Sequence, residues 1–570
     1  MKNLCYFFLF VLILGVYSCK TKNLSESTNV YALNKTLEAP NAAVVTAHYV
    51  ASEVGNKILK NGGNAVDAAI AVQFALDVCF PVAGNIGGGG FMIYRDKNGK
   101  VSTLDYREKA PLAATADMYL DENGNANLNK SQLGHLAVGV PGSVDGMVKA
   151  FEKFSKLKNW KALVQPSVDL AENGFKLTAS QASNLNGTKP KFKQANTRPN
   201  QFSNEKPFKT GELLIQKDLA KVYEAIRDEG REGFYAGWVA DSIVSEMKRG
   251  GGIISHEDLK RYNAKWREPV SGKYDEYKVY SMAPSSSGGV LLIQMLEMLE
   301  DFDLKEMGLH STESIHLITE VERRAFADRA KHLGDTDFYP VPLQEMMDPT
   351  YARNRMKDFN AKKASLSSEI NAGDFKESEQ TTHFCIVDTE GNAVSITTTL
   401  NGGYGSKVIV GGTGIFLNNE MDDFSAKPGT PNMFGLIGAE ANKIEPEKRM
   451  LSSMTPTIIE KNGRLAMVLG TPGGSTIITS VLQVALNYME FGMNATDAVQ
   501  AARFHHQWLP DEIRSEKNTL SPKVLKELKA MGHNINVRGN IGRVEAIIKN
   551  QDGSLDAAAD NRGDDHASGY

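Results

Sequence analysis

The sequence predicts an α+β fold in which helices cover antiparallel β-sheets, and two patterns support this prediction. Short turns with glycine at the second position stand between apolar arms, which is typical of β-hairpins; the turns are Asn98-Gly99, Glu390-Gly391, Asn462-Gly463 and Asp552-Gly553. Segments with apolar residues at helical spacing fall between the hairpins, at residues 213–228, 290–299, 311–329 and 477–488. Helices that alternate with hairpins in this way are expected to pack on the sheet faces as layers.

The chain begins like an exported protein. Met1-Lys2-Asn3 precedes the apolar run 4–16, and a basic start before a short apolar core is typical of a signal peptide, here predicted to span residues 1–18. The segment Val16-Tyr17-Ser18-Cys19 resembles a bacterial lipobox, in which Cys19 would carry the lipid and become the first mature residue. The alternative is ordinary secretion in which Cys19 has no role.

A polar segment follows the leader. Residues 19–38 are rich in Ser, Thr, Asn and Lys, which predicts a lipid-attached linker. No later stretch reaches membrane-spanning length. We therefore expect a periplasmic protein that is anchored to a bacterial membrane only through an N-terminal lipid.

Composition argues against several classes of function. Apolar residues make up 41% of the 570 residues and charged residues 23%, as in ordinary globular proteins, and the net charge of −4 predicts no binding to nucleic acid. The cysteines show no metal-ligand spacing and imply no disulfide framework; they are Cys5, Cys19, Cys79 and Cys385. The glycine run 87–90 precedes a strand rather than a helix, so it predicts no dinucleotide site. We expect neither a metal nor an organic cofactor.

The first elements after the linker follow from apolar spacing and capping residues. Residues 44–47 predict a short strand, and an apolar face over 54–59 predicts a helix that Gly62-Gly63 ends. Asn64 and Asp67 have the spacing of a capping box for the next helix. That helix is crowded with alanine, which allows close approach of its neighbours, so we expect it to be buried.

The candidate nucleophile stands at the start of the second hairpin. Residues 362–380 are polar and lack an apolar period, and a regular strand starts abruptly after them, which suggests a cut chain. A cut before Thr381 would give this threonine a free α-amine beside its own hydroxyl, which is a nucleophile that carries its own base. The alternative is that Thr381 and Thr382 simply open a β-strand. The segments 39–380 and 381–570 are expected to interleave in one core.

Three further groups have the chemistry that such a nucleophile needs. The glycines of 470–475 precede a helix, where exposed N–H groups and the helix dipole stabilise an oxyanion, although a plain turn fits the spacing too. The acids of Glu420-Met421-Asp422-Asp423 follow an apolar strand and suit a cation such as a substrate ammonium, and their spacing does not match a Ca²⁺ loop. Arg107 offers a fork of donors for a carboxylate, or a salt bridge to Asp105 or Glu108.

Several blocks in the same order resemble the γ-glutamyltranspeptidase family of N-terminal-nucleophile hydrolases. The resemblance extends from about residue 39 to residue 570. Its blocks are 62–69, 84–91, 107–111, 380–383, 399–401, 417–425, 451–456, 471–474 and 503–508.

The resemblance implies a four-layer αββα sandwich and autocatalytic cleavage between Gln380 and Thr381. The products would be a large subunit, 39–380, and a small catalytic subunit, 381–570, which form a heterodimer. The implied activity is γ-glutamyl transfer from glutathione and related compounds to water or to an amino acid or dipeptide acceptor, without a cofactor.

The resemblance also implies a role for each candidate residue. Thr381 would be the nucleophile, Thr399 would hydrogen-bond to it, and Gly473 and Gly474 would form the oxyanion hole. The α-carboxylate of the substrate would be bound by Arg107, Ser452 and Ser453. The α-ammonium would be bound by Asn401, Glu420 and Asp423.

One departure from the family pattern concerns the lid loop 426–438, where Phe434 stands in the place of a tyrosine that is common in bacterial relatives. Phe434 can shield the site but cannot form a latch through a hydroxyl. Two alternatives to the leading function stay open: an acylase of the same fold that acts on another amide, such as a β-lactam side chain, and an uncleaved envelope lipoprotein that only binds.

Overall fold

The computed structural model describes residues 30–370, 381–427 and 429–570. The predicted signal peptide, the lipidation site Cys19, the first part of the linker and Gln380 lie outside the described residues.

Two seven-stranded sheets form the centre of the molecule, and all their strand pairs are antiparallel. Sheet I has the order β19 (His566–Gly569), β2 (Ala43–Thr46), β10 (Thr382–Val387), β11 (Ala393–Thr399), β3 (Gly89–Arg95), β4 (Val101–Asp105) and β7 (Lys265–Arg267). Sheet II has the order β1 (Thr36–Ala39), β18 (Leu555–Ala559), β17 (Glu545–Lys549), β13 (Arg464–Gly470), β12 (Thr457–Lys461), β9 (Tyr277–Ser281) and β8 (Val270–Tyr274).

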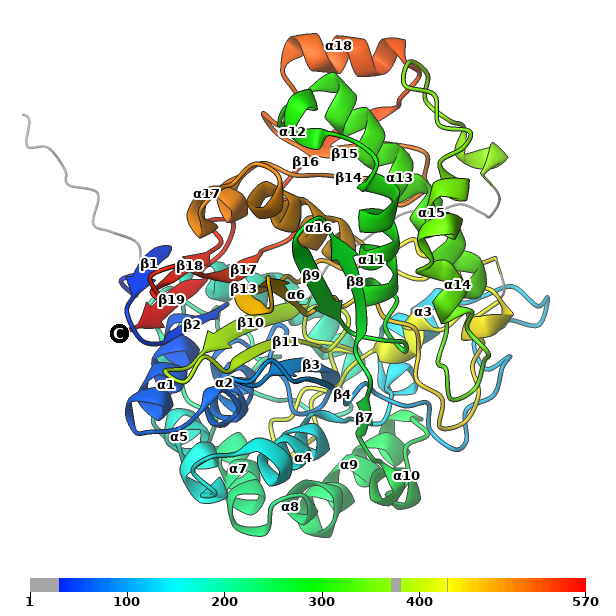
Figure 1. The fold of residues 1–570 in the computed structure, drawn as a ribbon. Helices are drawn as coiled ribbons and strands as arrows, with labels where there is room; N and C mark the ends of the chain where they lie inside the picture. Colours follow the sequence, from blue (N-terminus) through cyan, green and yellow to red (C-terminus); the bar gives the residue numbers. More distant parts are fainter. Residues whose placement is uncertain (1–29, 371–380, 428) are drawn as a thin grey trace, which may run out of the picture.

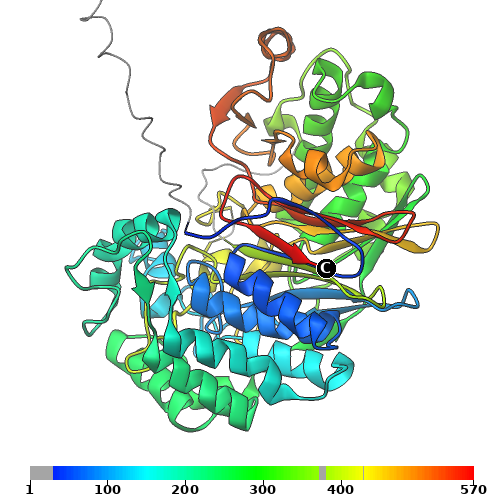
Figure 2. The same cartoon turned by 90° about the vertical axis from the view of Figure 1, so that its left-hand side faces the viewer.

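The two sheets pack face to face, and helices cover both outer faces (Figures 1 and 2). A buried cluster that includes Val45, Ile93, Cys385, Ile458 and Val468 joins the sheets. This arrangement confirms the predicted four-layer αββα sandwich of an α+β fold.

The helices on the sheet I side share one apolar core. They are α1 (Tyr49–Lys60), α2 (Ala65–Cys79), α4 (Ser143–Phe154), α5 (Trp160–Asn173), α6 (Ala179–Ala195), α7 (Lys217–Glu229), α8 (Glu232–Tyr235), α9 (Gly237–Gly250) and α10 (His256–Arg261). The helices on the sheet II side share a second core. They are α11 (Gly288–Leu299), α12 (Leu304–Met307), α13 (Thr312–His332), α14 (Leu343–Met346), α15 (Pro349–Arg355), α16 (Thr476–Met489), α17 (Ala495–Gln500) and α18 (Pro522–Ala530).

Shorter elements complete the fold. They are α3 (Leu128–Gln132), the pair β5 (Phe175–Lys176) and β6 (Leu213–Leu214), and the small sheet β14 (Phe504–His505), β15 (Ile513–Glu516) and β16 (Ile535–Arg538). Four single turns of 3₁₀-helix are η1 (His135–Ala137), η2 (Ser367–Glu369), η3 (Glu420–Asp423) and η4 (Glu440–Asn442).

The structure confirms all four predicted hairpins and the buried second helix. Asn64 and Asp67 form the expected capping box, and every residue of α2 is buried. The predicted helix 213–228 was wrong at its start, because Leu213–Leu214 pair with β5 as a strand and α7 begins only at Lys217. A short strand with apolar residues cannot be separated from a helix start by periodicity alone.

Each sheet contains strands from both sides of Thr381, so the predicted interleaving of the two segments is confirmed. The hairpin β10–β11 lies between β2 and β3, which come from the earlier segment. Thr381 immediately precedes β10, in the middle of sheet I. A cut before Thr381 would therefore leave both segments held by shared sheets.

Candidate active site

Thr381 is 8% exposed and lies where two cavities meet. The first is called the polar cavity here, and its lining includes Arg107, Thr381, Thr399, Asn401, Glu420, Asp423, Ser452, Ser453 and Gly474. The second is called the outer cavity, and its lining includes Phe80, Gln181, Thr381, Tyr404, Gly473, Arg543 and Asp564. A nucleophile at this junction can reach an amide whose acyl side lies in one cavity and whose amine side lies in the other.

The polar cavity thus brings together nearly all the site residues predicted from sequence, and Gly473 stands beside Thr381 in the outer cavity. Four further residues line the polar cavity that sequence reasoning did not select: Arg329, Leu436, Met454 and Ile477. Arg329 ends a predicted helix and Met454 lies in a block of the family resemblance, but no feature of the sequence distinguishes them from core residues.

Gly473 and Gly474 form a sharp turn before α16. Their φ angles are +142° and +56°, in the region that favours glycine, and the Gly473 carbonyl accepts hydrogen bonds from the Thr476 backbone and hydroxyl at 3.0 and 2.7 Å. The turn is therefore fixed to the first residue of the helix. Its position at a helix N-terminus beside Thr381 suits a developing negative charge.

A buried charge cluster occupies one end of the polar cavity. Arg107 Nη1 lies 2.6 Å from Glu420 Oε2, and Arg107 Nη2 lies 2.5 Å from Asp423 Oδ2. Glu108 is more distant, at 3.6 Å from the Arg107 guanidinium, and Asp105 accepts from the backbone N–H of Arg107 and pairs with the side chains of Arg267 and Arg449 instead. Arg107 therefore points into the cavity and pairs mainly with the two acids predicted to bind an ammonium.

The protonation of this cluster follows from its charge balance. Burial opposes the charged form of Arg107, but Glu420 and Asp423 outweigh this effect and raise the pKa of the guanidinium. Burial raises the pKa of Glu108 to about 8 and the pKa of Glu420 well above its ordinary value, in both cases against the attraction of Arg107. We infer that this cluster keeps at least one protonated acid at neutral pH.

Thr399 and Asn401 are fixed at the end of β11. The Thr399 hydroxyl accepts from the Asn401 backbone N–H at 2.7 Å, and the Asn401 side-chain amide donates to the carbonyl of Asn419 at 3.0 Å. Asn401 has a φ of +72°, which turns the chain back toward the acids of η3. The predicted hydrogen bond from Thr399 to Thr381 stays a prediction, although both side chains line the polar cavity.

The lid loop covers the polar cavity from the side of the glycine turn. Phe434 is 4% exposed, and a Cβ on Gly474 would lie 2.7 Å from its ring. Asn432 donates to Asp423 at 2.9 Å and accepts from the Phe434 backbone N–H at 2.9 Å. The loop that carries Phe434 is thus tied directly to the charge cluster.

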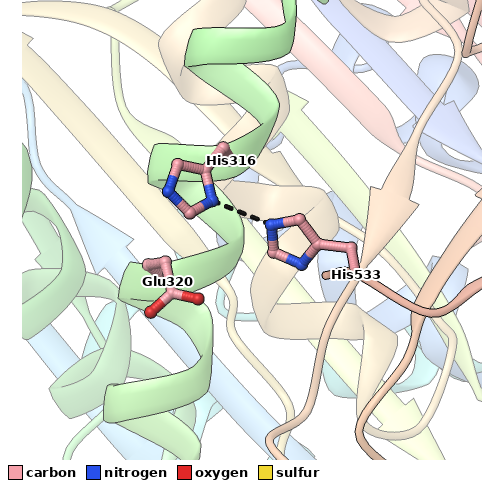
Figure 3. Close-up of side chains that lie close together, drawn as sticks. All are labelled: His316, Glu320 and His533. Atoms are coloured by element: carbon pink, nitrogen blue, oxygen red, sulfur yellow. Dashed lines mark hydrogen bonds between the residues drawn. The ribbon is translucent and has the colours of Figure 1, made fainter. Parts of the chain in front are cut away.

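One group of potential metal ligands comes together in the described part of the chain. His316 Nδ1 lies 2.8 Å from His533 Nε2, and Glu320 stands one turn along α13 (Figure 3). Arg323 and Arg324 pair with the Glu320 carboxylate, so its charge is already neutralised. A hydrogen-bonded histidine pair that joins the two predicted subunits accounts for this geometry.

Comparisons with known proteins match most of the chain. The family model for γ-glutamyltranspeptidase matches residues 51–570. The glutathione hydrolase proenzyme of Escherichia coli K12 is 46% identical over 539 residues, which are 94% of this chain and 93% of that protein.

Solved structures of related enzymes also resemble this chain. A cephalosporin acylase from Bacillus halodurans has a TM-score of 0.83 at 25% identity, covering 96% of this chain and 99% of its own. A chain of γ-glutamyltranspeptidase from Helicobacter pylori has a TM-score of 0.56 at 41% identity, covering 60% of this chain and 97% of its own.

Proposed function

Because the chain belongs to the γ-glutamyltranspeptidase family, we propose that it is a self-cleaving γ-glutamyltransferase and glutathione hydrolase. The strongest support for this proposal is the polar cavity, in which the candidate nucleophile Thr381 and a cluster of opposite charges line the same space. A γ-glutamyl group has an α-carboxylate and an α-ammonium at one end and an amide carbonyl at the other. The cavity offers a complementary group for each.

Maturation begins at the bond between Gln380 and Thr381. The Thr381 hydroxyl attacks the carbonyl carbon of Gln380, and the amide becomes an ester as the nitrogen of Thr381 takes the proton. Water then hydrolyses the ester, which leaves a carboxylate on Gln380 and a free amine and hydroxyl on Thr381. The segments 39–380 and 381–570 stay together as a heterodimer because they share both sheets.

In turnover, the α-amine of Thr381 acts as the general base for its own hydroxyl. Its ordinary pKa of about 7.7–8.0 places it near neutral pH, as a base requires. The Thr381 oxygen attacks the γ-glutamyl carbonyl, the N–H groups of Gly473 and Gly474 stabilise the oxyanion, and the amine product leaves with the transferred proton. Water or a second amine then attacks the resulting ester.

Recognition of the γ-glutamyl head divides between two sets of residues. Arg107, Ser452 and Ser453 bind the α-carboxylate, while Asn401, Glu420 and Asp423 bind the α-ammonium. The ion pairs of Arg107 with both acids support this division. The α-carboxylate of a zwitterion can pair with Arg107, and its α-ammonium can pair with Glu420 and Asp423. Because the zwitterionic head has no net charge, it leaves the net charge of the site unchanged when substrate enters.

The outer cavity supplies the place for the amine side of the reaction. It adjoins Thr381 and contains Arg543 and Asp564 in its lining. We assign it to the leaving amine and to the incoming amino acid or dipeptide acceptor, which occupy the same side of the scissile bond in turn. Both are themselves zwitterions or peptides, for which side chains of both charges are suitable contacts.

A second candidate is acyl transfer from a β-lactam side chain, which the similarity to a cephalosporin acylase favours. An acyl group without charges would lie against Arg107, Glu420 and Asp423 and desolvate them without pairing them, which costs free energy. The test compares purified enzyme on glutathione, on γ-glutamyl-p-nitroanilide and on a cephalosporin amide. Faster release of the cephalosporin side chain than of the γ-glutamyl products would overturn our proposal.

Replacing Phe434 with alanine is expected to raise the ratio of hydrolysis to transfer severalfold. The ring is buried against Gly474 in the polar cavity, and exclusion of water from an acyl-enzyme favours attack by an amine. The measurement is the ratio of glutamate to γ-glutamyl-glycylglycine formed at a fixed glycylglycine concentration. Phe434→Leu keeps apolar bulk and serves as the control. An unchanged ratio in Phe434→Ala would show that the ring does not exclude water from the acyl-enzyme.

We further propose that the protein is exported and lipid-anchored in the periplasm, on the basis of its leader sequence. Among the described residues, no helix has the length and apolar character needed to cross a bilayer. If the lipid on Cys19 is the anchor, Cys19→Ala is expected to move the protein from the membrane fraction to the soluble periplasmic fraction, as immunoblots of fractionated cells would show. Cys5→Ala, also in the leader, should remain with the membranes; membrane attachment of Cys19→Ala would refute lipidation.

A further inference from the structure

A second arginine, Arg329, lines the polar cavity together with Arg107. It lies in the last turn of α13 and is 4% exposed. Arg107 already pairs with Glu420 and Asp423, whereas no described carboxylate forms an ion pair with Arg329. Burial lowers the pKa of Arg329 to about 10, against the attraction of Asp423, so the side chain is still protonated at neutral pH.

Arg329 holds the serine pair through two hydrogen bonds. Its Nη2 donates to the Ser453 hydroxyl at 3.2 Å, and its Nε donates to the Ser287 hydroxyl at 2.9 Å. Ser287 in turn donates to the carbonyl of Ser452, from its hydroxyl at 2.6 Å and from its backbone N–H at 2.8 Å. One guanidinium therefore fixes both residues of the pair.

This arrangement makes both serine hydroxyls acceptors, so that each can donate its own proton elsewhere. The Ser453 hydroxyl accepts from Arg329, and the Ser452 hydroxyl accepts from the Met454 backbone N–H at 3.1 Å. A hydroxyl that already accepts a hydrogen bond has its own proton available for another acceptor. In the polar cavity, the α-carboxylate of a bound substrate can accept these hydroxyl protons.

We propose that Arg329 is a positioning residue for the α-carboxylate of the substrate, which it serves by orienting Ser453 and by adding a second positive charge to that end of the cavity. This inference rests on the proposed function and extends it, because it makes recognition of the carboxylate depend on two arginines from different elements. It also explains why a buried arginine stands in a cavity whose acids are already paired.

The test uses mature enzyme and three p-nitroanilides that differ only in the acyl group. The γ-glutamyl substrate has both charged groups, the 4-aminobutyryl substrate lacks the α-carboxylate, and the glutaryl substrate lacks the α-ammonium. In Arg329→Gln, KM for the γ-glutamyl substrate should rise about tenfold or more with little change in kcat, and kcat/KM for the glutaryl substrate should fall similarly. The rate with the 4-aminobutyryl substrate should not change.

The controls separate positioning from folding. Arg324 lies on the same helix, is 1% exposed and pairs with Glu320 and Asp358, so Arg324→Gln tests damage to α13 alone and should affect all three substrates equally. Arg329→Lys keeps the charge and should restore part of the carboxylate preference. If Arg329→Gln does not mature, Ser287→Ala replaces it in the test. This variant should show a smaller loss on the γ-glutamyl and glutaryl substrates and no change on the 4-aminobutyryl substrate.

The two proposals fail in different ways. Equal loss on all three substrates in Arg329→Gln and in Ser287→Ala would show a purely structural role and overturn the inference about Arg329. A wild-type enzyme that does not prefer the γ-glutamyl substrate over both truncated ones would instead overturn the proposed function.

Discussion

Thr381→Ala is expected to remain a single uncut chain and to have no measurable γ-glutamyl transfer or hydrolysis. The substitution removes the hydroxyl that attacks Gln380 in maturation and the γ-glutamyl carbonyl in turnover, so both reactions lose their nucleophile. The polar cavity itself should persist, since no described hydrogen bond of the charge cluster depends on Thr381. Denaturing electrophoresis and a glutathione assay of the purified variant measure both effects.

Thr381→Ser is the matched control for this experiment, because it keeps the hydroxyl and loses only a methyl group. It should be cut and retain activity, at a lower rate. Cleavage or turnover by Thr381→Ala would contradict the assignment of the nucleophile. Loss of both reactions in Thr381→Ser as well would show that folding rather than chemistry had been disturbed.

Arg107→Ala is expected to raise KM by roughly tenfold or more and to lower the free energy of unfolding by about 3–5 kcal/mol. The first effect is the loss of a charge-assisted pair with the substrate carboxylate. The second arises because Glu420 and Asp423 would remain buried without their counter-ion, and breaking a buried ion pair from one side is strongly destabilising. Steady-state kinetics and denaturant unfolding provide the two measurements.

Arg107→Lys keeps the positive charge but loses the planar fork that contacts two acids at once. It should recover most of the stability and only part of the substrate affinity. An unchanged KM in Arg107→Ala would remove this residue from substrate recognition, whatever its effect on unfolding.

Local features of the sequence predicted the fold well. The four hairpins follow from glycine turns between apolar arms, and the start of α2 follows from the capping box of Asn64 and Asp67, all of which act over a few residues. The start of α7 was wrong because Leu213–Leu214 pair with a strand about 40 residues earlier, which no local pattern encodes. The four-layer order came from the family resemblance rather than from periodicity.

The site was predicted as a set of residues but not as a network. Sequence reasoning placed Arg107 against a carboxylate and Glu420 and Asp423 against an ammonium, without showing that these groups pair with one another. Arg329 was missed because its significance lies in a contact with Ser453, 124 residues away. Likewise, only the packed structure shows that Thr381 opens to two cavities.

Intact-mass spectrometry of the purified wild-type protein tests the central claim most directly. Two fragments are expected, the smaller of which begins at Thr381, and they should copurify because their strands share both sheets. A single uncut chain, or a small fragment that begins at another residue, would contradict the self-cleaving threonine. The uncut result would leave an envelope binding protein as the better account.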